Sequence, residues 1–600
     1  MLSPVTEYQQ RIDSYSLRQD RLRRKLKPVP WIRLAMFLLI IFLVIMFTSI
    51  PEPLYIFAAL SAFAGFIIAG VIDARLKQMI QKLEALVSIN RQEIDALKGD
   101  YSVFDPGSEF IDHQHPYTHD LDIFGIGSLF QYINRTSTIF GRIRLAGYFQ
   151  SAFIFRDQIR ERQQAVEEIK RLPDFRQTLQ KIFYSGTTSE SDLSELSTWL
   201  KDEKKLSGIR FLKIAVYIIP SVTFIFLGLS IAGLIPYRFP VFLIILQLLF
   251  TFAYGRHTQS VHQTITSKFN ILERYAQALT LLEETPFSSD YAKSLKSRLN
   301  SENTETPGRV IKRLANLLNW MDSNLNLIAS VFLNGLLMFN IHLLIAVEKW
   351  RIRNRDLVPT WFDVLAEYDA LSSLATFAFN NPEFIYPETR SGDFHLNARE
   401  IGHPLIRKEE CVKNDIEIRG WNQFCIITGA NMSGKSTFLR TVGVNLLLAM
   451  IGAPVFAKKM HFTPIEIYSS IRTNDSLVKR ESYFYAELKR LKEIIDELEK
   501  GKQLLILLDE ILKGTNSKDK QTGSIALIKQ LMKYRLAGMF ATHDLLLGEL
   551  VDHYPENIIN LCFEISIEGD RMEIDYKLQP GVCKNLNASF LMKNMGIIIG

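Results

Sequence analysis

The chain has 600 residues, 47% of them hydrophobic, and 70 Lys and Arg against 64 Asp and Glu give a net charge of +6. This length exceeds what one hydrophobic core supports and predicts about three or four structural units. The net charge is too small for a chain of this length to argue for nucleic-acid binding. The high apolar fraction, which includes 40 Phe, indicates membrane segments. The four Cys have no C-x-x-C spacing, which argues against a zinc site or a disulfide framework and fits a reducing cytosol.

The first structural unit is expected at 1–75, where a basic N-terminal segment precedes two apolar runs at 31–50 and 54–72. Each run has about 20 residues, enough to cross a hydrocarbon core of about 30 Å. A proline-rich turn joins the runs, and basic residues flank only their outer ends. By the positive-inside rule both flanks are cytoplasmic, so the pattern predicts a transmembrane hairpin and not a cleaved signal peptide.

A second apolar hairpin is predicted at 211–254, between helical segments at 76–210 and 255–390. Its second run, 239–254, has about 16 residues, so a short crossing and a re-entrant segment both stay open. Basic residues again flank the outer ends, which places the soluble parts in the cytoplasm. The apolar run 327–347 contains Asn and His. A fifth crossing there would place the C-terminal part on the opposite side of the membrane from the basic N-terminus. We therefore expect a buried soluble helix there.

From 391 to 600, strands alternate with helices, which predicts an α/β domain with a parallel sheet. The loop at 429–436 reads G-x-x-x-x-G-K-S between an apolar strand and a helical pattern. Glycines let backbone N–H groups turn toward phosphate oxygens at a helix N-terminus, so a P-loop that binds ATP is predicted. The expected nucleotide-binding residues are Gly429, Ala430, Asn431, Met432, Ser433, Gly434, Lys435, Ser436 and Thr437.

Two further strands are expected to end at the same edge of the sheet. One apolar strand ends in Asp509 and Glu510, and another ends in His543. Ser436 and Asp509 are the predicted Mg²⁺ ligands, and Glu510 is placed to orient and deprotonate the attacking water. His543 is placed to contact the γ-phosphate or that water. Because parallel strands deliver these groups to one carboxyl edge, the sequence predicts ATP hydrolysis there.

Three segments resemble the ATPase domain of the MutS family, the ATP-binding-cassette-like proteins of DNA mismatch repair. They are TGANMSGKST at 428–437, LDEILKGT at 508–515 and FATH at 540–543. Helical pieces at 127–142 and 162–176 are similar to the family's core, or lever, domain. The resemblance implies a homodimer formed through the ATPase domains, with Ser482 reaching the partner's nucleotide. An N-cap role for Ser482 at the helix 485–500 is the alternative.

The expected architecture is multidomain, with transmembrane α-helical hairpins, an all-α lever or core domain and a C-terminal α/β P-loop domain of the ABC-like type. We find no counterpart of the family's mismatch-reading N-terminal domain, and an apolar insertion takes the place of its DNA clamp. The apolar hairpins and their basic flanks predict a multi-pass protein of the cell membrane with cytoplasmic domains. The resemblance implies that its ATP cycle is a conformational switch linked to mismatched or branched DNA. An ATP-driven membrane machine or transporter and an ATP-gated scaffold without DNA binding stay open.

Overall fold

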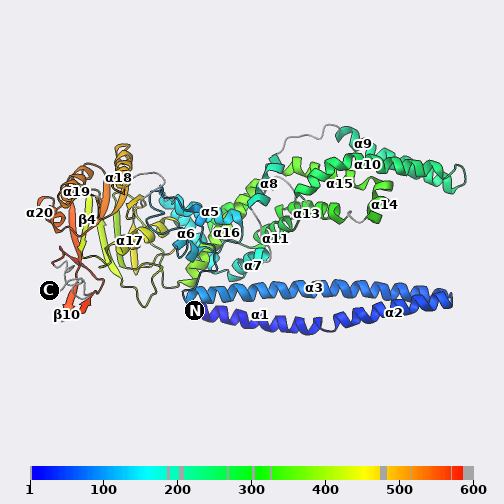
Figure 1. The fold of residues 1–600 in the computed structure, drawn as a ribbon, viewed down its shortest axis with the longest axis horizontal. Coiled ribbons are helices and arrows are strands. Elements are labelled where there is room, and N and C mark those ends of the chain that lie inside the picture. Colours follow the sequence, from blue (N-terminus) through cyan, green and yellow to red (C-terminus); the bar gives the residue numbers. More distant parts are fainter. Residues whose placement is uncertain are drawn as a thin grey trace. The chain divides into compact units, whose positions relative to one another are not determined.

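The computed structural model describes residues 3–184, 190–201, 209–265, 269–300, 305–323, 327–472, 483–513, 515–568 and 571–584. The chain divides into two compact units. Unit 1 comprises Met1–Arg135, Leu145–Pro173 and Leu371–Gly600, and unit 2 comprises Thr136–Arg144 and Asp174–Ala370. Most of the described elements are helices, and the described strands all lie between residues 388 and 580 (Figure 1).

The central sheet of unit 1 has six strands in the order β12-β9-β4-β8-β7-β6. Their bounds are β4 Gln423–Gly429, β6 Glu466–Ser470, β7 Leu504–Asp509, β8 Leu536–Thr542, β9 Ile558–Phe563 and β12 Leu578–Pro580. All neighbours pair in parallel except β12, which is antiparallel to β9. The carboxyl ends of β4, β7 and β8 therefore lie at one edge, as the apolar runs predicted.

Helices cover both faces of this sheet. Leu507 of β7 lies against Gly443 of α17 (Lys435–Met450). Ile506 and Leu508, which point the other way, pack in a core with α18 (Tyr483–Glu499) and α19 (Ser517–Leu531). This two-sided burial explains why β7 is a continuous apolar run instead of an alternating one.

Smaller elements complete the C-terminal part of unit 1. A second sheet has the order β1-β5-β2-β3, and β10 and β11 form a separate antiparallel pair. These strands are β1 Glu388–Thr389, β2 His395–Ile401, β3 Asn414–Arg419, β5 Lys459–Phe462, β10 Ser566–Glu568 and β11 Arg571–Glu573. The short helices η3 (Leu545–Glu549) and α20 (Leu550–His553) follow β8.

The N-terminal part of unit 1 is helical. Its elements are α1 Pro4–Leu26, α2 Val29–Ser49, α3 Pro53–Leu97, η1 Ser108–Phe110, α4 Leu129–Ile133 and α6 Arg156–Lys170, and α5 Ile139–Gln150 belongs partly to it. The helical piece predicted at 127–142 is thus two helices, α4 and α5. The piece at 162–176 is also divided, because Pro173 begins a new helix.

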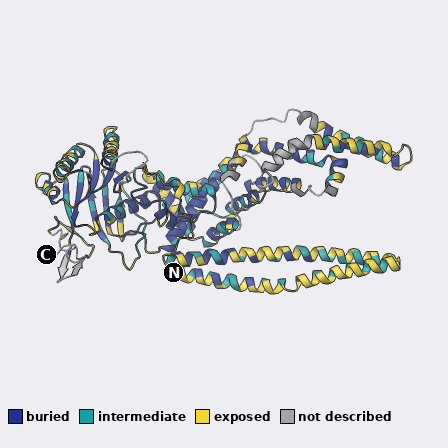
Figure 2. Cartoon of the chain, in the orientation of Figure 1, coloured by how far each residue is buried: buried dark blue, intermediate teal, exposed yellow. Residues whose placement is uncertain are grey.

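The helices α2 and α3 lie side by side, and most of their side chains are exposed (Figure 2). Their close approach is visible at Gly65, where a Cβ would lie 2.9 Å from Met36 Cε. Arg33, the charge near the start of the first predicted apolar run, lies 3.7 Å from the buried carboxylate of Asp73. The helix α3 continues well past residue 72, the end of the predicted apolar span, and its later turns pack against α1.

Three helical stretches among the described residues are long and apolar enough to cross a membrane. They lie within Pro4–Ser49, Pro53–Leu97 and Lys213–Ile231, and the apolar stretch Arg238–Ala253 is shorter. The exposed side chains on these helices include Trp31, Phe57 and Phe252, which are 72%, 69% and 75% accessible. Exposure of large apolar groups on this scale indicates contact with a non-aqueous environment or another surface.

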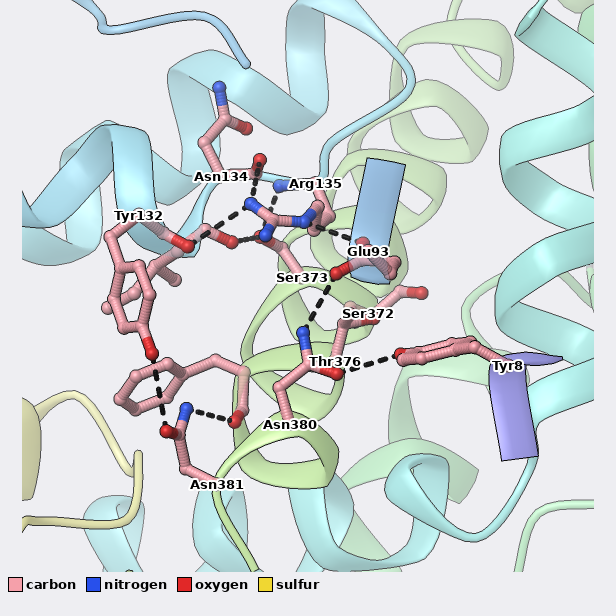
Figure 3. A network of polar contacts seen from close by, with 12 residues as sticks. Tyr8, Glu93, Tyr132, Asn134, Arg135, Ser372, Ser373, Thr376, Asn380 and Asn381 are labelled. Atoms are coloured by element: carbon pink, nitrogen blue, oxygen red, sulfur yellow. Dashed lines mark hydrogen bonds and ion pairs between the residues drawn. The ribbon is translucent and has the colours of Figure 1, made fainter. Parts of the chain in front are cut away.

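A buried polar network ties α1 and α3 to the C-terminal turns of α16 (Val358–Asn380) (Figure 3). Arg135 Nε donates to Glu93 Oε1 at 2.6 Å, and both side chains are only 3% accessible. Asn380 Nδ2 donates to the other oxygen of Glu93 at 2.8 Å, and Tyr8 OH donates to Asn380 Oδ1 at 2.8 Å. The network therefore anchors the base of the N-terminal helices within unit 1.

Substitution of Glu93 by Gln should destabilise unit 1 strongly. Removing one partner of a buried ion pair leaves the other charge uncompensated and typically costs about 3–5 kcal/mol. The matched control is Glu84→Gln, because Glu84 pairs with Arg23 at 2.8 Å on the surface, where a pair contributes at most about 1 kcal/mol. Thermal unfolding in detergent should show a large fall in midpoint for Glu93→Gln alone. Equal midpoints for both variants would contradict an anchoring role.

Unit 2 is helical throughout its described residues. Its helices are α7 Pro173–Tyr184, α8 Glu190–Lys201, α9 Ile209–Ile231, α10 Arg238–Ile265, α11 Phe269–Glu284, α12 Asp290–Ser297, α13 Pro307–Ser323, α14 Leu327–Leu337 and α15 Phe339–Asn354, with the first turns of α16. The prediction of one buried helix at 327–347 is wrong. Met338 adopts a left-handed backbone (φ 50°), and the chain bends there by 78° between α14 and α15.

Candidate functional site

The loop between β4 and α17 has the turned backbone that a phosphate cradle requires. Met432 and Gly434 have φ values of 67° and 103°, and a Cβ at Gly434 would lie 3.1 Å from the ring of Tyr576. Lys435 is only 4% accessible, and its Nζ donates to the carbonyls of Gly429 and Ala430 at 2.8 Å each. Burial lowers the pKa of Lys435, whereas the carboxylates of the neighbouring strand oppose that shift. The ammonium is thus held inside the loop.

The end of β7 meets the start of α17 through a short polar contact. Ser436 Oγ donates to Asp509 Oδ2 at 2.5 Å. Burial raises the pKa of Asp509, and the hydrogen bond from Ser436 opposes that rise. The second oxygen, Asp509 Oδ1, is buried and has no hydrogen-bond partner. A buried carboxylate oxygen without a donor is costly, so this atom is suited to a cation.

Glu510 lies beside His543 at the ends of β7 and β8. Glu510 N donates to Ala541 O at 2.8 Å, and Glu510 Oε1 lies 3.6 Å from His543 Nδ1. The nearby His543 ring is the largest cause that lowers the pKa of Glu510, to about 2, with a further contribution from Lys513, whose Nζ is 3.8 Å away. Glu510 is therefore a carboxylate at neutral pH. Lys520 Nζ lies 3.4 Å from the other ring nitrogen of His543.

The turn after Glu510 is strained and is held by a buried acid that the sequence did not reveal. Glu510 and Leu512 both have left-handed φ values, 50° and 61°, which cost about 1–2 kcal/mol per residue with a side chain. Glu487 of α18 accepts hydrogen bonds from Leu512 N at 2.5 Å and Lys513 N at 3.2 Å. These bonds fix the strained turn and hence the position of Glu510.

A cavity of about 440 Å³ opens beside the loop. Its lining includes the predicted residues Asn431, Met432, Gly434, Lys435, Ser436, Thr437 and Glu510. Two further lining residues, His403 and Tyr576, had no predicted role. Burial lowers the pKa of His403 to about 4, so its imidazole is neutral. Asn414 Nδ2 donates to Tyr576 O at 3.0 Å and holds that segment beside the loop.

The structure thus brings together the predicted residues from three strand ends. Lys435 and Ser436 follow β4, Asp509 ends β7 with Glu510 directly after it, and His543 follows β8. Ser482 lies outside the described residues, so its two interpretations stay predictions.

Comparison with known proteins agrees with this arrangement. The family model for MutS domain V matches residues 425–593. The C-terminal domain belongs to the MutS family. The DNA mismatch repair protein MutS of Thermotoga maritima is 33% identical over 238 residues, which are 39% of this chain and 29% of that protein. This MutS-type domain V therefore contains the loop, the acids of β7 and His543.

Two other relatives match over comparable lengths. MutS of Thermus aquaticus is 36% identical over 182 residues, covering 30% of this chain and 22% of the relative. The DNA mismatch repair protein MSH6 of Arabidopsis thaliana is 31% identical over 257 residues, covering 39% of this chain and 18% of the relative. The matches thus span less than a third of each relative's length.

Proposed function

We propose that the chain is a membrane-anchored MutS-type ATPase that binds and hydrolyses ATP as a conformational switch. The observation that carries this proposal is the cavity of about 440 Å³ that Lys435, Ser436 and Glu510 line together. Phosphoryl transfer depends mainly on positioning and on electrostatic stabilisation, and these residues supply both. Membership of domain V in the MutS family, whose members use ATP with Mg²⁺, supports the same activity.

Each residue has a defined task in this proposal. The loop amides and Lys435 hold the phosphates, since backbone N–H groups and the start of α17 favour negative charge. Glu510 accepts a hydrogen bond from the attacking water and orients it. The low pKa of Glu510, about 2, keeps its side chain ionised, so that it can accept this hydrogen bond and, as the phosphoryl group transfers, the proton of the water. His543 lies 3.6 Å from the Glu510 carboxylate, and its proposed task is to contact the outer phosphate or the attacking water.

Mg²⁺ fits the oxygens of Ser436 and Asp509. Their contact of 2.5 Å and the unpartnered Asp509 Oδ1 place hard oxygen donors together, which is the ligand type that Mg²⁺ prefers. When bound, Mg²⁺ supplies positive charge to the phosphate oxygens. No group of three or more His, Cys, Asp or Glu side chains in the described part of the chain is arranged to hold a metal. The remaining ligands would therefore be water and the nucleotide.

The proposed location is the cell membrane, with the soluble parts in the cytoplasm. The apolar stretches of α2, α3 and α9 support this location, and the apolar part of α10 adds a shorter one. Exposed basic residues near the end of α1, such as Arg24 and Lys25, precede α2 on the side assigned to the cytoplasm. We further propose a homodimer formed through domain V, on the basis of the family resemblance.

The proposal also includes binding to mismatched or branched DNA. The matched relatives are named as DNA mismatch repair proteins, but the match covers only 29% and 18% of the lengths of two of them. We expect the purified chain in detergent to bind mismatched or branched duplexes more tightly than a matched homoduplex. Binding should weaken with salt, because each neutralised phosphate contributes about −0.9 to the slope of log K against log salt. Fluorescence anisotropy at several salt concentrations measures this preference.

The DNA measurement also separates the alternatives. Equal and negligible binding to all duplexes, together with intact ATP hydrolysis, would exclude the DNA role and leave an ATP-driven membrane machine or an ATP-gated scaffold. The control protein for this measurement is Lys458→Ala. This substitution removes an exposed positive charge directly before β5 that pairs with Glu400. This variant should retain both ATP hydrolysis and any DNA preference.

A further inference from the structure

The short helix α14 has an inside-out distribution of side chains. Its residues 327–337 contain no charged side chain. Val331, Phe332 and Leu337 are 46%, 65% and 41% accessible, whereas Asn334 is 3% accessible. A water-soluble helix normally turns its polar residues outward and its apolar residues inward. The reverse arrangement is expected where the surroundings are as apolar as the protein interior.

The helix α14 packs against the apolar part of α10. A Cβ at Gly335 would lie 3.1 Å from Ile244 Cγ2 and 3.5 Å from Leu248 Cγ. These contacts fall near the centre of the apolar stretch Arg238–Ala253. Small residues at such an interface let two backbones approach closely, as in helix packing within membranes. The medium that contacts the middle of α10, water or lipid, therefore also contacts the outer face of α14.

Polar groups at the break after α14 find their hydrogen-bond partners within the protein. Asn334 Oδ1 accepts a hydrogen bond from Asn340 N at 2.9 Å, and Asn334 Nδ2 donates to Ser330 Oγ at 3.1 Å. Asn340 lies in the first turn of α15, where a backbone N–H has no helical partner. Satisfying that donor from a buried side chain is the condition for irregular backbone at membrane depth.

The helices on either side of α14 return to the same protein core. Trp350 Nε1 of α15 donates to Val310 O of α13 at 2.8 Å. Arg351 forms a buried ion pair with Glu348 at 2.5 Å, so the second half of α15 lies in polar protein surroundings. With 11 residues, α14 spans about 16 Å, roughly half of a hydrocarbon core of about 30 Å. It is too short to cross.

We propose that α14 is a re-entrant membrane helix whose face formed by Val331, Phe332 and Leu337 contacts lipid acyl chains. This inference rests on the proposed membrane location of α9 and α10. Because α14 enters and leaves on one side, it adds no crossing. The apolar run at 327–347 is therefore compatible with a cytoplasmic domain V on the same side as the N-terminus.

Depth-dependent quenching in bilayers tests the proposal with the full-length chain. A genetically encoded fluorescent amino acid is placed singly at Phe332, Phe242 or Ile352, and each variant is reconstituted in vesicles with brominated acyl chains. Phe242 of α10 is the positive control, and Ile352, which is 59% accessible near the end of α15, is the negative control. We expect loss of most fluorescence at 332 and 242 and little loss at 352.

The outcomes separate this inference from the proposed membrane anchor. Quenching at 242 without quenching at 332 would overturn the re-entrant helix and leave the anchor intact. Absence of quenching at both positions, in vesicles that retain the protein, would overturn the bilayer location of α10 as well. Gly335→Leu provides a second test, because a larger side chain should separate α14 from α10 and change quenching at 332 while 242 stays quenched.

Discussion

Lys435→Ala should lower the affinity for ATP by at least about 100-fold, since a buried charge-assisted contact contributes about 1.5–3 kcal/mol and Lys435 would make several. The side chain is 4% accessible and donates to two loop carbonyls. Its removal therefore takes away the phosphate contact and also the bonds that shape the loop. The remaining amides of the loop cannot replace a full positive charge in a buried setting.

Titration with a fluorescent ATP analogue measures this effect. Lys458→Ala is the control, because Lys458 is exposed and paired with Glu400 outside the cavity. The thermal midpoint of Lys435→Ala without nucleotide should fall by only a few degrees, since two hydrogen bonds are lost, and a cooperative transition shows that the variant is folded. Unchanged ATP affinity in a folded Lys435→Ala protein would remove the P-loop from the proposed function.

Glu510→Gln should leave ATP binding intact and reduce the hydrolysis rate by about 10²- to 10⁴-fold, the range for a group that handles the proton of a nucleophile. Glutamine keeps the shape of the side chain but removes the charge that His543 and Lys513 hold in place. The neutral amide orients the attacking water poorly and cannot accept its proton. Affinity depends mainly on the loop, so it should change little.

Single-turnover phosphate release reports the chemical step, and analogue titration reports binding on the same preparation. Glu493→Gln is the matched control, because Glu493 is an exposed acid of α18 that pairs with Arg490. Its hydrolysis rate should equal that of the unchanged protein. Normal turnover in Glu510→Gln would assign water activation to another residue and leave Glu510 with a structural role at the end of β7.

The candidate site was largely predictable because its determinants are local in sequence. A strand followed by G-x-x-x-x-G-K-S and a helix specifies a phosphate loop through backbone geometry, and the structure has β4, the loop and α17 in that order. The apolar runs that end in Asp509 and His543 predicted parallel strands, and the pairing of β7 with β8 and β8 with β4 confirms that arrangement.

Features that depend on long-range contacts were not predictable in this way. Glu487 reaches the backbone of Leu512 across 25 positions of sequence, and nothing in its local pattern distinguishes it from other acids of α18. The length of α3 depends on packing with α1, and the break at Met338 depends on a left-handed backbone that its residue type does not favour.

The amino-acid sequence by itself determined the apolar helices, the glycine-containing loop between β4 and α17 and the order of the strand ends, because periodicity and turn chemistry act over a few neighbouring residues. Only the tertiary structure decided that Asp509 keeps an unpartnered buried oxygen beside Ser436, that Glu93 and Arg135 anchor the N-terminal helices, and that α14 turns its apolar face outward. Burial, hydrogen-bond satisfaction and pKa shifts arise from groups that are distant in sequence and become neighbours only in the folded chain.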